Sequence, residues 1–401
     1  KYQNILLYLQ ANALQHRLII RDVKTLEITQ IFTCIEDIES IEVWSLEDPS
    51  WICKIDEGTA GLINFKWTPD SRHIMSTAEF HVRITVWSLV NKSVSYIKYP
   101  KSIEMNMSFS QNGNYLALLE RRNCKDYVTI FSCSSWQLLK HFEPDMNDAA
   151  GISFAPDGNC MCIWESLFEY KIALYSLSGH CIATYAADDW NLGIKTVSWC
   201  LSSQFLAIGN YDNKIHVLNH IIWKPIAEFE PSETIENTSV VEVEKYWGPE
   251  QGARSESRAS SKYDIILDRP LSIPAIKAEG SKSNLRFGVS QAVFSADNRY
   301  LMTRMDNMPT SLWIWSVKEM ELVTILIQIR PIKFVCWDPA KSRLVLCTGS
   351  NKLYMWSPDG STAVEVPNQV TFEICSLSWH PTGDCVLLKG KDQMCLCFIQ
   401  S

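Results

Sequence analysis

Histidine and carboxylate pairs are the residues of this sequence whose types could support catalysis or metal binding. His216 and His220 are four positions apart, a spacing that brings both to one face of a helix. The surrounding HVLNH pattern instead predicts a strand followed by a turn, from which the two side chains diverge. Acidic pairs such as Asp188–Asp189 fall in predicted loops, where we interpret them as solvated charge or as docking points for a basic partner. The residues therefore predict no catalytic site, no metal and no cofactor.

The fourteen cysteines do not form a metal or disulfide framework in this sequence. No Cys-x-x-Cys is present, and most of the cysteines fall inside alternating apolar segments, as do Cys160, Cys162, Cys336, Cys347, Cys375, Cys385, Cys395 and Cys397. We interpret them as buried, reduced thiols in an intracellular, reducing compartment.

Two groups of residues are candidates for contacting a protein partner. Arg121, Arg122 and Lys125 occur together in ERRNCKD within an otherwise acidic chain, and form either an electrostatic docking patch or a solvated turn. Several tryptophans next to turns either anchor a partner or pack against a fourth strand; they are Trp51, Trp136, Trp190 and Trp223.

A repeated sequence pattern must position all of these residues. It is clearest in residues 65–89, where an alternating apolar segment containing Trp67, a Thr-Pro-Asp-Ser turn and two further apolar segments follow one another. Period two predicts strands, and the turns predict an antiparallel meander. The first-strand aromatic recurs about every 42 to 45 residues, the blade period of WD-repeat β-propellers; the positions are Trp67, Phe109, Phe154, Trp199, Phe294, Trp337 and Trp379.

Nine third strands lie between Leu18 and Ile399, so we predict an all-β, WD40-type β-propeller of about nine repeat units (seven to nine blades) in a single ring. N-terminal blades fill residues 1–230, and C-terminal blades in residues 285–401 close the same propeller, with Ile5–Leu9 expected as the fourth strand of the last blade. Trp44, Trp87, Trp315 and Trp356 share one third-strand position and are predicted to pack between blades.

Residues 231–284 interrupt the repeats and are rich in Ser, Glu, Lys and Arg. We interpret them as a polar, flexible insertion in which only residues 265–276 have the pattern of a strand. One repeat is also too short, because the third strand in residues 41–46 follows the previous one by about 23 residues, half the period. We expect a segment to be missing between Ile35 and Val43, since a blade without its first two strands leaves unpaired edges.

The overall composition excludes some classes of partner. A net charge of −8 disfavours a general nucleic-acid binder, and no apolar run reaches the length of a membrane span. The sequence begins at Lys1 rather than at Met, so we expect that the natural start is missing.

Seven segments together resemble the WD repeat-containing protein 8 family, WD-repeat proteins of the centrosome and spindle pole. They are RLIIRDVKTLEI, CKIDEGTAGL, RITVWSLVNKSVSYIKYP, RRNCKDYVTIF, EYKIALYSL, SSQFLAIGNYDNKIHVLNH and LCTGSNKLYMWSPDG. The resemblance extends over nearly the whole chain. The sequence departs from the common WD-repeat pattern, because its third strands have Trp-Ser in place of Trp-Asp.

The resemblance implies a non-catalytic scaffold in the cytoplasm and cytoskeleton, at the centrosome, spindle pole body or other microtubule-organising centre. Members of the family anchor microtubule minus ends with a coiled-coil anchoring protein and, in fungi, load a minus-end-directed kinesin; in animals they are linked to spindle assembly and ciliogenesis. The alternatives are a translation-factor-like propeller that binds ribosome or RNA, a ubiquitin-ligase substrate receptor and, last, a propeller hydrolase. The family offers no catalytic or binding residue to transfer onto this sequence.

Overall fold

The computed structural model describes residues 5–12, 15–22, 28–34, 40–45, 48, 50–58, 61–78, 83–101, 106–186, 192–236, 240–247, 260–276, 287–366, 372–391 and 393–399. These residues form strands and turns with no α-helix among them, which confirms the all-β prediction. No helix in this part of the chain has the length and apolar character to cross a lipid bilayer. The chain divides into two compact units, Lys1–Phe154 with Leu177–Gly179, and Ala155–Ser176 with His180–Ser401.

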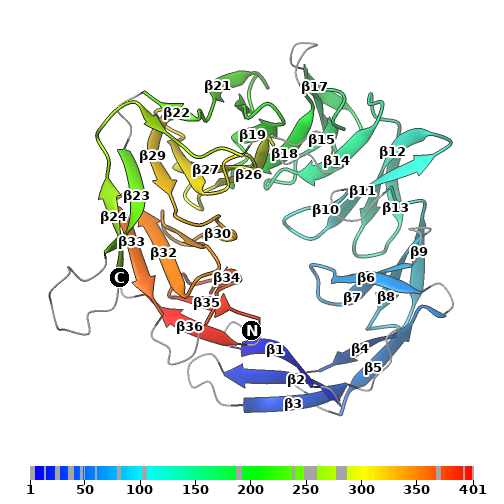
Figure 1. Cartoon of the computed structure of the whole chain (residues 1–401). Helices are drawn as coiled ribbons and strands as arrows, with labels where there is room; N and C mark the ends of the chain where they lie inside the picture. Colours follow the sequence, from blue (N-terminus) through cyan, green and yellow to red (C-terminus); the bar gives the residue numbers. More distant parts are fainter. Residues whose placement is uncertain are drawn as a thin grey trace. The chain divides into compact units, whose positions relative to one another are not determined.

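The first unit holds four antiparallel sheets within its described residues, with the orders β1-β2-β3, β4-β5, β6-β7-β8-β9 and β10-β11-β12-β13, followed by strand β14 (Figure 1). The strands are β1 (Ile5–Asn12), β2 (Gln15–Asp22), β3 (Ile28–Cys34), β4 (Ser40–Trp44), β5 (Ile52–Asp56), β6 (Leu62–Trp67), β7 (His73–Ala78), β8 (Arg83–Ser88), β9 (Val94–Lys98), β10 (Met107–Phe109), β11 (Tyr115–Arg122), β12 (Lys125–Ser132), β13 (Leu138–Phe142) and β14 (Ala149–Phe154). Strand order follows chain order, as a meander requires.

The second unit is also built from antiparallel strands. Its strands are β15 (Cys160–Glu165), β16 (Lys171–Ser176), β17 (Cys181–Ala186), β18 (Ile194–Trp199), β19 (Phe205–Asn210), β20 (Ile215–Asn219), β21 (Pro225–Phe229), β22 (Thr234–Ile235), β23 (Val240–Trp247), β24 (Ser260–Ile265), β25 (Leu271–Ser272), β26 (Val289–Phe294), β27 (Tyr300–Met305), β28 (Ser311–Ser316), β29 (Glu321–Ile327), β30 (Phe334–Trp337), β31 (Leu344–Cys347), β32 (Lys352–Ser357), β33 (Gly360–Glu365), β34 (Ser376–Trp379), β35 (Cys385–Lys389) and β36 (Met394–Phe398). The groups β18–β21, β26–β29 and β30–β33 each contain four antiparallel strands in chain order.

One turn design recurs between the first two strands of the sheets. In each turn the side-chain oxygen of an Asp or Asn accepts a hydrogen bond from the backbone N–H two residues later. The acceptors and their distances are Asp70 (2.9 Å, from the Arg72 N–H), Asn112 (3.0 Å), Asp157 (3.1 Å) and Asp297 (3.3 Å). The next position has a positive φ, between 56° and 74° at Ser71, Gly113, Gly158 and Asn298. Asp, Asn and Gly favour this geometry, which is why the repeated Pro-Asp-Gly-like motif marks the turns.

The second and third strands form the core of each sheet. Residues 116–119 of β11 and residues 206–208 of β19 are fully buried. The predicted packing role of the third-strand tryptophans is confirmed for Trp315 and Trp356, which are 6% and 1% exposed. The indole N–H of Trp87 donates to Ser76 (2.7 Å) in the strand beside it.

The insertion contains more strands than we predicted. β23 pairs in parallel with β29, and β24 pairs antiparallel with β23, so the sheet has the order β24-β23-β29-β28-β27-β26. Short strands β22 and β25 pair with each other. The expectation that only residues 265–276 could form a strand is therefore wrong, because β23 and β24 are stabilised by pairing with a distant strand.

The N-terminal strand also differs from expectation. β1 pairs with β2 along its whole length, from Ile5 opposite Asp22 to Asn12 opposite Gln15, and is the first strand of its own sheet. In the described residues β34, β35 and β36 form a sheet of three strands. The assignment of Ile5–Leu9 as the fourth strand of the last sheet is therefore wrong: the local hairpin pairs it with its sequence neighbour. The sheet β4–β5 has only two strands, and residues 35–39 lie outside the described part of the chain.

Candidate functional site

The predicted cationic patch lies at the tip of the β11–β12 hairpin. Arg122 and Lys125 face each other across a two-residue turn in which Asn123 and Cys124 have φ values of 50° and 62°. Two consecutive positive φ values are characteristic of the tight hairpin turn whose twist matches that of the strands. The turn therefore brings Arg121, Arg122 and Lys125 together on one hairpin, as the sequence predicted.

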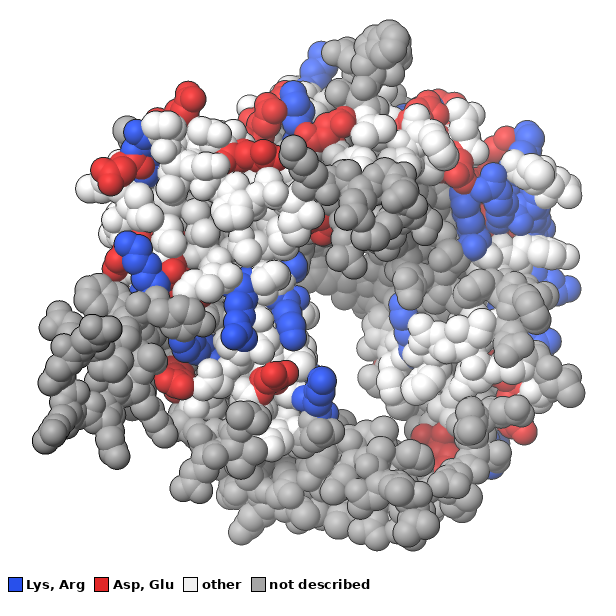
Figure 2. All heavy atoms as spheres, in the orientation of Figure 1, with Lys and Arg blue, Asp and Glu red and all other residues white. Residues whose placement is uncertain are grey.

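Each cation of this hairpin is paired with a carboxylate. Arg121 lies 2.6 Å from Asp148, Arg122 lies 2.9 Å from Glu120, and Lys125 lies 2.7 Å from Glu143. Glu120 is buried, and the other members of these pairs are exposed. A hydrogen bond to Glu143 raises the pKa of Lys125. Figure 2 shows acidic side chains beside the Lys and Arg side chains that gather over this region. Because the carboxylates neutralise the cations, the hairpin tip presents little net positive charge to a partner.

A charge network centred on the buried Asp126 holds this hairpin next to its tip. Lys101 Nζ lies 2.7 Å from Asp126, 2.5 Å from Asp148 and 2.7 Å from the carbonyl oxygen of Ala149, and the Ala149 N–H donates to Asp126 (2.8 Å). The Asp126 side chain is fully buried. Hydrogen bonds from Lys101 and Arg121 lower the pKa of Asp148. The network links the hairpin to the start of β14, which indicates a structural role for Arg121.

The candidate tryptophans lie in different environments. Trp51 precedes β5 and is 38% exposed, so it is accessible to a partner. Trp136 has a φ of 54° and packs edge-to-face on His73, with ring centroids 5.5 Å apart. Trp223 adopts the same turn conformation (φ of 52°) and is 8% exposed. Trp136 and Trp223 therefore pack within the fold, and Trp190 lies outside the described residues.

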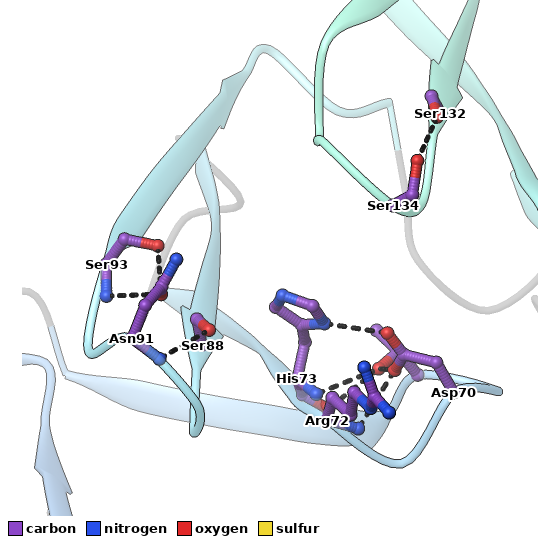
Figure 3. A network of polar contacts seen from close by, with 9 residues as sticks. Asp70, Arg72, His73, Ser88, Asn91, Ser93, Ser132 and Ser134 are labelled. Atoms are coloured by element: carbon purple, nitrogen blue, oxygen red, sulfur yellow. Dashed lines mark hydrogen bonds and ion pairs between the residues drawn. The ribbon is translucent and has the colours of Figure 1, made fainter.

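The contact between His73 and Trp136 is supported by the turn beneath it. Asp70 accepts from the Arg72 N–H through one carboxylate oxygen and contacts His73 Nδ1 at 2.9 Å through the other (Figure 3). The neighbouring β8–β9 turn is closed by Asn91, which accepts from the backbone and hydroxyl of Ser93 (Figure 3). These polar contacts satisfy turn backbone groups and leave no constellation suited to catalysis.

Burial is complete for only some of the described thiols. Cys160, Cys162, Cys347 and Cys385 are buried, as predicted, whereas Cys336, Cys375, Cys395 and Cys397, which were also predicted to be buried, are only partly buried. Burial raises the pKa of Cys336 to about 12 and that of Cys160 to about 11, so these thiols are protonated at neutral pH. Cys124 and Cys181 are exposed. No group of three or more His, Cys, Asp or Glu side chains in the described ranges is placed to hold a metal ion.

The second unit has a groove formed in part by the insertion. It has a volume of about 850 Å³ and lies between β21 and the segment 230–236 on one side and β28–β29 on the other. Its floor is the stacked pair Phe229 and Trp315, and Met320, Leu322 and Val323 form one wall. Sequence reasoning missed this site because its two sides are about 90 residues apart in the chain.

The rim of the groove is acidic. Among the described residues the charged side chains that line it are Glu228, Glu230, Glu236 and Glu321. Lys214 lies within 4.0 Å of both Glu228 and Glu230. Glu228 is bonded to Lys214 (2.7 Å), which lowers the pKa of its carboxyl. In the described part of the chain no cation pairs with Glu236 or Glu321. An apolar floor with an acidic rim favours a basic, amphipathic segment.

Comparison with known proteins assigns the family. No protein-family model matches the chain. The WD repeat-containing protein WRAP73 of Mus musculus is 45% identical over 423 aligned positions, which cover 98% of this chain and 91% of the mouse protein. The chain belongs to the WRAP73 family of WD repeat-containing proteins. The narrower resemblance to WD repeat-containing protein 8 stays a prediction.

Two more distant similarities agree with this family and its fold. An uncharacterized WD repeat-containing protein of Schizosaccharomyces pombe is 21% identical, covering 91% of this chain and 77% of its own length. The crystal structure of the C-terminal WD40 domain of Sif2 matches all of the chain and 93% of that domain, with a TM-score of 0.53 and 11% sequence identity. At that identity the structural match shows the fold alone, a WD40-type β-propeller, as predicted.

Proposed function

We propose that this protein is a non-catalytic scaffold at the centrosome or spindle pole, where it anchors microtubule minus ends and supports spindle assembly, and ciliogenesis in ciliated cells. The observation that carries the proposal is the acidic, apolar-floored groove of the second unit, which can bind a polypeptide segment but holds no nucleophile–base pair. Membership of a WD-repeat family supports a protein-binding role. The location at the microtubule-organising centre rests on the sequence resemblance.

In this proposal the groove receives a segment of the coiled-coil anchoring protein; in fungi, a minus-end-directed kinesin is the expected cargo. Basic residues of the segment pair with Glu236 and Glu321, and its apolar side chains contact Leu322 and the Phe229–Trp315 stack. Apolar contact supplies most of the affinity, while the acidic rim directs association and orientation. The paired cations of the β11–β12 hairpin are a less favourable contact, because a partner must first displace Asp148 or Glu143.

Purification of the tagged full chain from dividing cells, with mass spectrometry and imaging of the same tag, tests the proposal. Recovery of a coiled-coil anchoring protein with signal at the spindle pole or centrosome is expected. The double variant Glu236→Lys, Glu321→Lys should lower that recovery by about tenfold or more, whereas the matched variant Asp359→Lys, Glu373→Lys, on exposed acids outside the groove, should not. Recovery of ribosomal or ubiquitin-ligase subunits with diffuse signal would overturn the proposal.

A further inference from the structure

Two lysines of the second unit occupy the same place in their repeats but have different surroundings. Lys195 and Lys333 each lie four positions before the first-strand aromatic of their sheet, Trp199 and Trp337. The ammonium group of Lys195 lies 2.5 Å from Asp306, which follows β27 in the next sheet. Lys333 is exposed, and no carboxylate of the described residues forms an ion pair with it. The first lysine is therefore neutralised and the second is not.

The carboxylate of that ion pair is replaced by a lysine in the sheet that follows Lys333. Asp306 lies 12 positions after Phe294, the first-strand aromatic of its own sheet. The sheet after β30–β33 is β34–β36, and the residue 12 positions after its aromatic Trp379 is Lys391, which is exposed. This sheet therefore supplies a second cation where the other supplies a counter-ion, and like charges repel.

Contacts within each sheet place the two lysine side chains alike. Lys195 Nζ lies 5.3 Å from the ring centroid of Tyr211, in the turn between the second and third strands. Gly349 has the matching position in the other sheet, and a Cβ atom added there would lie 2.4 Å from Lys333 Nζ. Lys333 therefore crosses its turn as Lys195 does, without reaching a carboxylate in the described part of the chain.

A guanidinium group without a counter-ion lies beside Lys333. Arg304, near the end of β27, donates from Nη2 to the carbonyl oxygen of Ile332, the residue before Lys333. Its Nε is buried and has no hydrogen-bond partner among the described residues. Burial lowers the pKa of Arg304, although the charge of Asp306 opposes the shift. Burying a cation without an ion pair costs free energy, so a bound anion would stabilise this group.

Further cations extend the surface around Lys333. Arg330 is exposed in the segment before β30, and Lys389 is exposed at the end of β35. Figure 2 shows Lys and Arg side chains gathered over β30, β34 and β35, which Figure 1 labels. In the described segments that precede the first strands or join the second and third strands of the last three sheets, the acids are Glu373 and the already paired Asp306. Positive charge therefore prevails at this end of the sheets.

We propose that these side chains form a cationic surface that binds an extended acidic polypeptide segment. The surface consists of Arg304, Arg330, Lys333, Lys389 and Lys391. Because its cations come from three sheets, they fit carboxylates spaced along a chain better than one compact anion. Hydrogen bonds between charged partners are among the stronger ones in proteins. The surface shares no residue with the acidic groove, so this inference does not depend on the proposed function.

Exposed apolar side chains among the cations favour a polypeptide as the occupant. Ile329 and Phe334, which flank Arg330 and Lys333 in the chain, are 43% and 38% exposed. An acidic segment that carries an apolar residue can pair with the cations and cover Phe334, whose burial adds affinity. A nucleic acid would extend beyond the surface, where the net charge of −8 repels it.

Fluorescence anisotropy with the purified full chain tests the proposal. The probe is a labelled peptide rich in Glu with one central Phe, and its control has Gln in place of each Glu. The Glu peptide should bind, and the double variant Lys333→Glu, Lys391→Glu should weaken its binding about tenfold or more. The matched variant Lys318→Glu, Lys341→Glu makes the same change in net charge at exposed lysines on the opposite ends of the strands. It should change the Kd by less than about twofold. Denaturant unfolding checks that both variants are folded.

Several results would overturn the cationic surface as a docking site for an acidic segment. The Glu peptide could fail to bind the wild-type chain, the Gln peptide could bind as tightly, or both double variants could weaken binding equally. The last result would show that net charge alone, and not this surface, attracts the peptide. A single-stranded oligonucleotide that binds more tightly than the Glu peptide, and loses this binding in the Lys333→Glu, Lys391→Glu variant, would identify a nucleic acid as the occupant and contradict the proposal.

Discussion

The ring of Phe229 stacks on the indole of Trp315, with centroids 4.4 Å apart and planes inclined by 13°. Phe229 ends the fourth strand of one sheet, and Trp315 lies in the third strand of the next. Their contact joins the two sheets at the floor of the acidic groove. The same pair therefore supports both the stability of the second unit and the shape of its candidate docking surface.

Removal of this stack should destabilise the protein. Phe229 is 4% exposed, so Phe229→Ala should lower the free energy of unfolding by about 3–5 kcal/mol, the usual cost of deleting a buried aromatic ring. Denaturant unfolding measures the change. Phe168→Ala is the matched control, because that ring is 91% exposed and its loss should cost less than about 0.5 kcal/mol. Equal costs for the two variants would contradict the packing role of Phe229.

Acid should weaken the charge network next to the tip of the β11–β12 hairpin. The pKa of Asp148 is lowered in the folded state, so its ion pairs stabilise the fold fully above the unfolded pKa, and this contribution is lost as the pH falls through the folded pKa. Wild type should exceed Asp148→Asn in stability at pH 6, and the difference should vanish between roughly pH 5 and pH 2. A difference that stays constant over this range would rule out the ion-pair explanation.

Strain at the hairpin tip can be relieved. Cys124 is exposed and has a φ of 62°, a conformation that glycine adopts more readily than other residues. Cys124→Gly should therefore raise the free energy of unfolding by about 1 kcal/mol. Cys124→Ala also removes the thiol but retains the Cβ, and should give no gain. Equal stabilisation by both substitutions would show that the thiol, and not the backbone, is the source of the effect.

The hydrogen bond between β23 of the insertion and β32 of the neighbouring sheet should stabilise the fold. Tyr354 of β32 donates to Glu244 of β23 (2.8 Å), and both side chains are buried. Burial raises the pKa of the Tyr354 phenol, which stays protonated and can donate at neutral pH. Tyr354→Phe should cost about 1–3 kcal/mol, because it removes a hydrogen bond from a buried carboxylate. Tyr96→Phe, at an exposed tyrosine, should leave the free energy of unfolding unchanged. If Tyr354→Phe also left the free energy of unfolding unchanged, β23 would add little stability.

Local sequence patterns predicted the parts of the fold that depend on interactions between residues near one another in the sequence. Period-two alternation and Asx turns gave the strand meander, and the third-strand tryptophans were placed in the core because their spacing matches from one repeat to the next. β23 was missed because the polar composition of the insertion predicted no strand there, and because its partner β29 lies far along the chain, with Val240 opposite Thr324. Glu244 is tolerated inside the protein because Tyr354, 110 positions away, donates to it.

The candidate sites were predictable only in part. The sequence located Arg121, Arg122 and Lys125 on one turn, but their partners Asp148 and Glu143 lie 27 and 18 positions away from Arg121 and Lys125, so the neutralisation of the patch appears only in three dimensions. The half-sheet β4–β5 was visible as a short period.

The central claim is that the groove above Phe229 and Trp315 docks a basic, amphipathic protein segment. Site-specific photo-crosslinking tests it most directly, with a photoreactive amino acid at Leu322 in the groove wall and, as a control, at the exposed Phe168. In dividing cells the Leu322 position should crosslink a coiled-coil protein through a segment rich in Lys or Arg and apolar residues, and the Phe168 position should not. Crosslinks to that protein from Phe168 alone, or an acidic segment captured at Leu322, would contradict the account.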